Sequence, residues 1–408
     1  MFRAVLLKIL FLVGLALFLP RVLLLYAPPQ LVELNDRLQT GQVSEVAVGL
    51  TSLPDYFKIH APLVHQDRFL LVTNQLTETS QDQYLSYLSH YGLHPKLIYQ
   101  AEPVVLAKLP SQLISKVSLI SDRLVSDLAI VDQADLSGLV VDLQNTGFVP
   151  DPTIELLFQV LRLAKSYHQP VILLDRPNPL GYLYEGPLVE VRLDQRKLQL
   201  PWRYGLSLGE LAGYLNQTCF DQQVNLTILP IKNYFRNQRV LSFQQLQLVY
   251  TSALFGLLNQ ISPVDVKRDC HDDFQCFSLP EYLNFPINKW YELRASLRKY
   301  DIDVSLCRYF NRRTQQYFVG VRLNVHDINR VTYLGLWQTI VEQLQQAQIN
   351  LHNSDQVNRL FGKAVGKQLT FGKLTAATSQ KLNQDLRQYF NRIKPHLIYH
   401  PWPVPVWH

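Results

Sequence analysis

Short apolar runs alternate with amphipathic segments through the first half of the chain. The runs typical of buried strands are SEVAVGL, RFLLVTNQ, PKLIYQ, LSGLVVDLQ and PVILLD. Segments 80–92, 110–120 and 151–169 are expected as helices, the last with Asp151 as its N-cap and Pro152 in its first turn. Apolar strands that alternate with helices predict a parallel sheet covered on both faces, which is a Rossmann-like α/β layer.

The pattern becomes mixed from about residue 205. Ser207 and Glu210 have the spacing of a capping box at the start of a helix. NLTILPI is typical of a strand, and QQYFVGVRLNVHD predicts a long strand before a helix from about Val331. The end of the chain, LIYHPWPVPVWH, has too many prolines for a helix. We therefore expect a Rossmann-like α/β domain over residues 28–204 and a smaller α+β domain over residues 205–408.

The first 27 residues have their own composition. Arg3 and Lys8 precede an apolar run, which Pro20 and Arg21 interrupt before it resumes. A charged start followed by such a run is typical of a bacterial export signal, and its nineteen residues from 9 to 27 would just span a bilayer. We expect a hydrophobic N-terminal signal anchor over residues 1–27, which would place the protein at the membrane or beyond it in the bacterial cell envelope. A cleaved signal peptide and a buried N-terminal helix are the alternatives.

Composition excludes several classes of protein. At 47% hydrophobic and 18% charged residues, the 408-residue chain is globular. Its net charge of +6 suits an anionic polymer or membrane surface, but no nucleic-acid motif accompanies it, and we expect no nucleic-acid partner. No G-x-G-x-x-G run occurs, so a dinucleotide is not expected, and we expect no cofactor.

The segment CHDDFQC is the one place where the cysteines cluster. Cys270 and Cys276 would form a local disulfide in an oxidising compartment or remain thiols. His271 and the two following aspartates suggest a metal, but no second ligand cluster with zinc spacing follows. We therefore expect no metal site.

Polar residues directly follow three of the predicted strands. These clusters are Thr73–Asn74, Asp142–Asn145 and Asp175–Asn178. The carboxyl ends of parallel strands share one edge of a sheet, and ligands bind beyond that edge. Asn, Asp and Arg side chains there can bind sugar hydroxyls or a carboxylate. For each residue the alternative is a structural one, in which it caps a following helix or stabilises a turn.

Two further residues are candidates for chemistry near this edge. Glu102 follows the strand PKLIYQ, where apolar neighbours would raise its pKa and suit it to general acid catalysis, with Asp142 and Asp175 as possible partners. An ordinary loop glutamate is the alternative. Arg203 precedes a helix N-terminus and suits an anion site, unless it is a structural arginine bound to a carbonyl or carboxylate. No G-x-S-x-G motif supports acyl transfer.

Three motifs resemble a known family. VVDLQNTG, then VILLDRPNPLG with EGPLV, then LPWRYGLSLGELAGYLN have the order and spacing seen in the NamZ-like exo-β-N-acetylmuramidases, also called the DUF1343 family. FLLVTNQLT and FVGVRLNVHD are similar to two further motifs of that family. The resemblance implies a Rossmann-like domain joined to a smaller α+β domain, with a cleft between them that removes terminal N-acetylmuramic acid (MurNAc) from peptidoglycan fragments. It implies Glu102 as the general acid, and a substrate-binding set of Asn74, Asp142, Gln144, Asn145, Asp175, Arg176, Asn178 and Arg203.

The chain also departs from the family pattern. Where the family has P-E-H-G, this chain has AEPV, which keeps only Glu102. Asn145 replaces a second aspartate, and Tyr204 replaces the histidine of an R-H-G motif. Residues 249–276 match no family segment. Two readings stay open: a divergent hydrolase of MurNAc saccharides, or an inactive relative that binds peptidoglycan fragments or an envelope protein. Binding of nucleotides would favour a third, a non-carbohydrate α/β enzyme.

Overall fold

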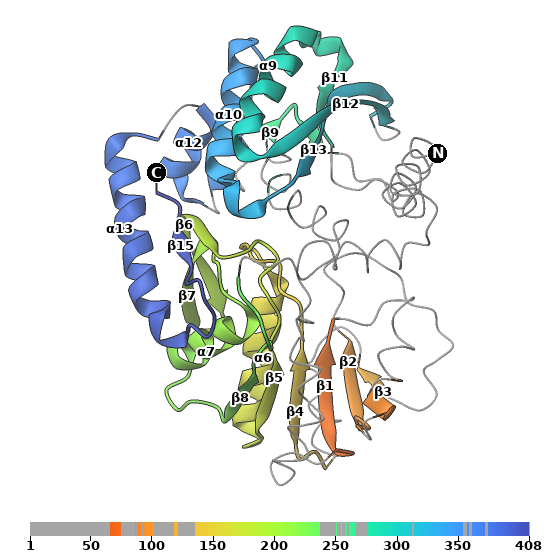
Figure 1. Ribbon diagram of the computed structural model, residues 1–408, viewed down its shortest axis with the longest axis vertical. Coiled ribbons are helices and arrows are strands. Elements are labelled where there is room, and N and C mark those ends of the chain that lie inside the picture. The colour runs from red at the N-terminus through yellow and green to blue at the C-terminus, as the bar shows by residue number, and fades with distance from the viewer. Residues whose placement is uncertain are drawn as a thin grey trace, which may run out of the picture. The chain divides into compact units, whose positions relative to one another are not determined.

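The computed structural model (Figure 1) describes most of the chain after residue 65. The described ranges are 66–74, 93–100, 118–120, 135–236, 261–266, 276–311, 314–353, 361–371 and 374–407, with isolated positions between them. The predicted anchor over residues 1–27, the candidate acid Glu102 and Cys270 lie outside these ranges. Ala47–His408 is a compact unit of its own, separate from Met1–Val46. Within the described ranges, no helix combines the length and the apolar character that crossing a membrane requires.

A six-stranded parallel sheet forms the first part of the unit, as the alternation of apolar runs and helices predicts. Its strand order is β3-β2-β1-β4-β5-β8, and every neighbouring pair is parallel. This is the strand order of a Rossmann-like layer. The strands are β1 (Phe69–Thr73), β2 (Leu97–Gln100), β3 (Ser118–Ile120), β4 (Gly138–Asp142), β5 (Val171–Leu174) and β8 (Leu226–Leu229).

Strand β3 corrects one prediction. Residues 110–120 were expected as a helix, but Ser118–Ile120 pairs with β2 at the edge of the sheet. A short, mostly apolar run such as VSLI fits a buried strand and a helix turn equally well by periodicity alone. Pairing with β2, which no local pattern reveals, decides between them.

Two helices that lead into strands of this sheet begin where the sequence predicts. In α6 (Pro152–Ser166), Asp151 is the N-cap and its side chain accepts a hydrogen bond from the Thr153 N–H. In α7 (Leu208–Cys219), Ser207 and Glu210 form the predicted capping box. Both helices thus have their N-termini at the carboxyl end of the sheet, because each leads back to the start of the next parallel strand.

A long antiparallel hairpin of β6 (Leu183–Leu193) and β7 (Arg196–Arg203) is inserted between β5 and α7. Its register shifts between Glu185 and Leu188, at Gly186–Pro187. The proline-rich end is not helical, as predicted: β15 (Val404–Pro405) pairs in parallel with β6. Residues 397–407 therefore run along this hairpin beside α13 (Ala376–Ile393), and Figure 1 shows them there. We call residues 397–407 the C-terminal strap.

The second half contains an antiparallel sheet with the order β10-β11-β13-β12. Helices α9 and α10 contact each other, and α9 packs on β12, so the strands and helices are segregated as in an α+β fold. The predicted boundary at residues 204–205 stays a prediction. The remaining elements are β9 (Ile261–Ser262), β10 (Asp265–Val266), β11 (Cys276–Pro280), α9 (Ile287–Leu297), β12 (Ile302–Asn311), β13 (Gln316–Val325), α10 (Tyr333–Gln346), β14 (His352–Asn353) and α12 (Lys363–Phe371).

Candidate functional site

The strand order reverses direction between β1 and β4, and ligands of such sheets bind outside the carboxyl ends at this switch point. Thr73, the last residue of β1, is level with Asp142 at the end of β4 and with Gln100 at the end of β2. The three predicted polar clusters therefore do lie along one edge. The chain leaves β2 two strand spacings from β4, which is roughly 10 Å. Glu102 comes two residues after this point, outside the described residues.

Asn74, directly after β1, bonds across the switch point to the loop after β4. Its side-chain amide donates to the Gln144 carbonyl at 2.9 Å, and its Oδ1 accepts from the Gln144 N–H at 2.8 Å. The Gln144 side chain donates in turn to the carbonyls of Asn145 and Pro177. Its Oε1 is buried and, in the part of the chain that the structure describes, has no hydrogen-bond partner. This oxygen can accept a hydrogen bond that the described chain does not supply.

Asp142 and Arg176 form a bidentate ion pair at the same edge. The Arg176 Nε donates to Asp142 Oδ1 at 2.5 Å, and Nη2 donates to Oδ2 at 3.0 Å. The Asp142 side chain is fully buried, while that of Arg176 remains 12% exposed. A bidentate, partly desolvated pair of this kind is strong and fixes the plane of the guanidinium group. Among the described charged residues of the predicted set, Arg176 is thus the one that reaches the surface.

Asp175 has a structural position instead. Its carboxylate is inaccessible to solvent and accepts hydrogen bonds from the N–H groups of Arg176 and Gly209, the Ser207 hydroxyl and the Tyr399 hydroxyl. Burial raises its pKa from 3.8 to about 7, and these hydrogen bonds counteract the shift only in part. Asp175 therefore ties the end of β5 to the start of α7 and to the C-terminal strap.

Asn145 and Asn178 also bond within the chain. The Asn178 Oδ1 accepts from the Leu180 N–H at 2.8 Å and its amide donates to the Leu206 carbonyl, which stabilises the turn of the D-R-P-N-P-L-G run. Asn145 donates to the Tyr204 hydroxyl at 2.9 Å. Gly147, between them, has φ +85°, and a Cβ there would lie 2.2 Å from the Asn178 Oδ1. These are the contacts of a close-packed corner.

Tyr204, which stands where the family has histidine, is at the centre of this corner. Its buried hydroxyl donates to Asp151 Oδ2 at 2.8 Å and accepts from the Gly147 N–H at 3.1 Å as well as from Asn145. Burial raises its pKa well above its usual value, and Asp151 adds to the shift. The tyrosine therefore stays neutral and holds the loop after β4 against α6.

Arg203 is buried completely, as in the structural alternative for this residue. Its guanidinium group donates to the carbonyls of Leu180, Val331 and Ile328, and it lies 5.4 Å from the centre of the Tyr333 ring. Burial lowers its pKa, which the nearby Tyr333 and Glu185 counteract. These contacts join β7 to the segment before α10.

Glu185 was not recognised from the sequence. It is fully buried, and its two oxygens accept from the N–H groups of Tyr333 and Leu334, each at 2.8 Å. These are the free N–H groups at the start of α10, whose N-cap Thr332 makes no side-chain hydrogen bond. A carboxylate inside the apolar run of β6 was the signal in the sequence, because an acid in a buried strand requires partners.

Glu210 has a wider role than the predicted capping box. It forms a buried ion pair with Arg236, and its Oε1 also accepts from the Ile398 N–H at 2.7 Å. Arg236 donates further to the carbonyls of Gly205 and Tyr399. Together with Asp175, this pair anchors the C-terminal strap, a role that only the three-dimensional contacts reveal.

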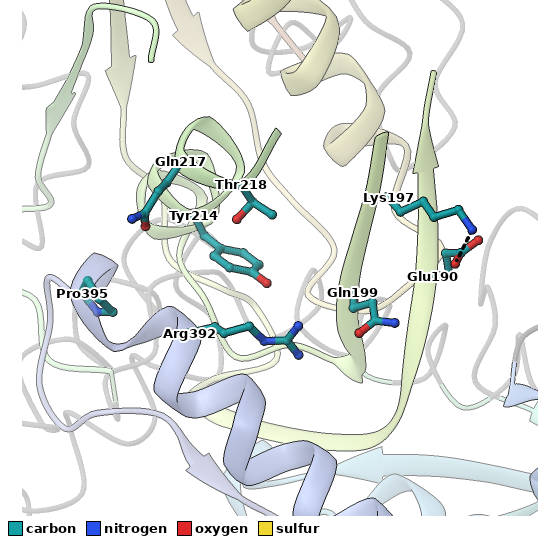
Figure 2. Close-up of a pocket in the computed structure, with 8 residues that line it drawn as sticks. All are labelled: Glu190, Lys197, Gln199, Tyr214, Gln217, Thr218, Arg392 and Pro395. Carbon is teal, nitrogen blue, oxygen red and sulfur yellow. Dashed lines mark hydrogen bonds and ion pairs between the residues drawn. The ribbon is translucent and has the colours of Figure 1, made fainter. Parts of the chain in front are cut away.

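A hollow of about 580 Å³ lies away from the switch point, between the β6–β7 hairpin, the second half of α7 and the end of α13. Figure 2 shows the guanidinium group of Arg392 between Tyr214 and Gln199. The lining residues of α7 begin about seven residues, or roughly 10 Å, beyond its N-terminus, so this hollow is separate from the switch point. No residue of the predicted set lines it. Its lining is Glu190, Lys197, Gln199, Tyr214, Gln217, Thr218, Arg392 and Pro395.

The described residues contain no cluster of three or more metal-ligating side chains. Cys276 is buried in β11, but Cys270 is outside the described residues, so their pairing stays a prediction. Burial raises the pKa of the Cys219 thiol, at the end of α7.

Comparison with known proteins adds to this description. Residues 110–254 match the family model described as exo-beta-N-acetylmuramidase NamZ, N-terminal. The matched stretch includes the candidates from Asp142 to Arg203, but neither Asn74 nor Glu102. Over 101 residues the chain is 31% identical to the peptidoglycan beta-N-acetylmuramidase NamZ of Bacillus subtilis strain 168, and this match spans 24% of each protein.

Two crystal structures have a similar fold. Both are DUF1343 family proteins from Bacteroides fragilis NCTC 9343, each 17% identical to this chain, with TM-scores of 0.65 and 0.62. Each comparison covers 87% of this chain and 99% of the other. At that identity the structures support the fold alone. The findings point the same way: residues 110–254 are similar to the N-terminal part of exo-beta-N-acetylmuramidase NamZ, and the fold is similar to that of DUF1343 proteins.

Proposed function

We propose that this protein is a divergent β-N-acetylmuramidase that removes MurNAc from peptidoglycan fragments at the switch point of its parallel sheet. The observation that carries the proposal is the Asp142–Arg176 pair, which presents a fixed, partly exposed guanidinium group at the edge where Gln144 has a side-chain oxygen without a partner among the described residues. MurNAc carries a carboxylate, which a guanidinium group binds, and hydroxyl groups that can donate to Gln144. The pair also lies within the stretch that matches the family model.

Glu102 is the proposed general acid. In this role it donates a proton to the glycosidic oxygen as the bond to the anomeric carbon breaks. The leaving sugar departs as an alcohol, and a hydroxyl group from water replaces it at the anomeric carbon. The chain leaves β2 roughly 10 Å from β4, a separation that a single sugar unit can bridge. We also propose that residues 1–27 direct the protein to the bacterial cell envelope, where such substrates occur.

A second function is favoured by a specific observation. Both described carboxylates that the sequence suggested as partners of Glu102 are engaged: Asp142 binds Arg176, and Asp175 is buried under four hydrogen bonds. Neither is oriented to activate water or to attack a sugar. An inactive relative that binds peptidoglycan fragments through Arg176 is therefore the alternative proposal.

Turnover and binding measured on the same protein separate the two functions. The full chain is incubated with a MurNAc–GlcNAc disaccharide and with a chromogenic MurNAc glycoside, and binding of free MurNAc is followed by calorimetry. Hydrolysis that Glu102→Gln abolishes while MurNAc still binds supports the enzyme. Binding without hydrolysis, weakened at least tenfold by Arg176→Ala, supports the binding protein.

The matched control is Arg308→Ala. Arg308 forms a similar bidentate pair with Glu281, at 3.2 and 2.9 Å, on the antiparallel sheet. Its loss should change neither hydrolysis nor MurNAc binding. If wild-type protein neither hydrolyses nor binds these sugars, both proposals are wrong, and screening for nucleotide ligands becomes the next experiment.

A further inference from the structure

The C-terminal strap and the outer face of α13 form a surface of aromatic and cationic side chains. Lys394 Nζ lies 5.5 Å from the centre of the Trp402 ring, and the guanidinium carbon of Arg387 lies 5.3 Å from that of Trp407. Arg387 and Lys394 are seven residues apart, which is nearly two helical turns and places them on one face. Lys394 directly follows α13 and keeps a helical backbone, so one cation–indole pair lies on the last turns of α13 and the other just past its end.

Both indole rings are displayed to solvent by a rigid backbone. Trp402 is 39% exposed and Trp407 is 52% exposed, whereas the other three tryptophans of the chain are buried. The strap is fixed at one end by the Tyr399 hydroxyl, which donates to Asp175, and along its length by the pairing of β15 with β6. Because the backbone is already ordered, contact through these rings costs little conformational entropy.

The charge of this surface is not neutralised. From residue 386 to residue 408 the sequence contains three Lys or Arg residues and no Asp or Glu. In the described part of the chain, Arg387 and Lys394 have aromatic faces as partners rather than carboxylates. A cation over an aromatic ring keeps its full charge, so the surface attracts an anionic partner.

We infer that the C-terminal strap and α13 form a docking surface for an anionic phospholipid membrane. Tryptophan side chains prefer the boundary between headgroups and acyl chains, where the ring is apolar and its N–H can still find an acceptor. Lys and Arg beside them complement the negative potential of anionic headgroups. Trp402 and Trp407, each beside a cation, therefore provide both the interfacial aromatic rings and the positive charge on one surface. The inference does not depend on muramidase activity.

The distribution of tryptophans provides a direct measurement. The full chain is reconstituted in vesicles of phosphatidylcholine with or without 30% phosphatidylglycerol, and the fluorescence of Trp402 and Trp407 is quenched with acrylamide or with acyl-brominated lipid. Trp202, Trp290 and Trp337 are buried and give a constant background. In anionic vesicles the exposed pair should lose acrylamide quenching and gain quenching by brominated lipid. A Trp402→Phe/Trp407→Phe variant should lose both changes.

Charge variants test the electrostatic part. Each cation near an anionic surface changes the docked-to-undocked ratio by about fivefold, so Arg387→Gln/Lys394→Gln should lower that ratio by roughly twenty-five-fold. The matched control, Arg298→Gln/Lys299→Gln, removes two exposed cations near the antiparallel sheet, where Lys299 lies 4.8 Å from the Tyr300 ring centre, and should have no effect. At 1 M salt the difference between the vesicle types should disappear.

Three results would overturn the inference. The first is equal quenching of Trp402 and Trp407 in neutral and anionic vesicles. The second is docking that the Arg387→Gln/Lys394→Gln variant retains in full. The third is protection of the two indoles by soluble peptidoglycan fragments but not by anionic vesicles, which would assign this surface to glycan instead.

Discussion

Asp175 should make folding stability depend on pH in the opposite direction from an ordinary aspartate. Burial raises its pKa from 3.8 to about 7 in the folded protein. Between these values the folded protein binds a proton that the unfolded chain has released, so the contribution of Asp175 to stability is largest below pH 4 and falls as the pH rises to 7. A shift of about three pKa units corresponds to about 4 kcal/mol of unfolding free energy.

Replacement of Asp175 by Asn should remove this contribution. The amide is neutral at every pH, and its Oδ1 can still accept from the N–H groups of Arg176 and Gly209. We expect urea unfolding of wild-type protein at pH 4.5, 6 and 8 to show a loss of stability that Asp175→Asn lacks. The difference in unfolding free energy between wild type and Asp175→Asn should change by about 3 to 4 kcal/mol between pH 4.5 and pH 8.

The control is Asp221→Asn. Asp221 is largely exposed and pairs with Arg196 on the surface, so its loss should shift stability by less than about 1 kcal/mol and leave the pH dependence of wild type. Parallel stability curves for wild type and Asp175→Asn would refute the reasoning. Such a result would mean that the Asp175 carboxyl ionises in the folded protein as readily as in the unfolded chain.

Three further predictions concern the described contacts. Arg176→Ala leaves the buried carboxylate of Asp142 without its ion pair and should destabilise the protein by about 3 kcal/mol in urea unfolding, whereas Arg176→Lys should lose less because it keeps the charge. Glu185→Gln leaves the charge of Arg203 uncompensated and replaces one acceptor at the start of α10, so it should lower the unfolding free energy by about 2 to 4 kcal/mol. A melting temperature unchanged within 1 °C would contradict this expectation. Cys219 should react with iodoacetamide far more slowly than free cysteine at pH 8 and at the normal rate in urea, because burial shields its thiol and raises its pKa.

Local signals in the sequence were sufficient for the parallel arrangement of the longer strands and for two helix starts. Asp151 and the Ser207–Glu210 box are read from residues three or fewer positions apart, and both occur as predicted. Residues 118–120 were misassigned because a short apolar run carries no information about its strand partner. Periodicity therefore predicts the existence of elements better than the type of a short one.

The sequence predicted the sheet edge at which the polar candidates gather, but not the contacts that each of them makes. The edge at which Asp142 and Arg176 meet follows from parallel strands ending in polar residues. Their ion pair, and the burial of Asp175 and Arg203, depend on partners far away in the sequence, such as Tyr399 and Val331. Periodicity and motif spacing do not report on such pairings, so they could not separate surface residues from structural ones.

The bond between Asp175 and Tyr399 has a consequence for the order of folding. It spans 224 residues, and at a synthesis rate of 5 to 20 residues per second Tyr399 follows Asp175 by roughly 10 to 45 seconds. During this time the Asp175 carboxyl has its donors from Arg176, Ser207 and Gly209 but lacks Tyr399, and closing so long a loop is entropically costly. The contacts of the C-terminal strap therefore join the parallel sheet after all of its strands have been synthesised.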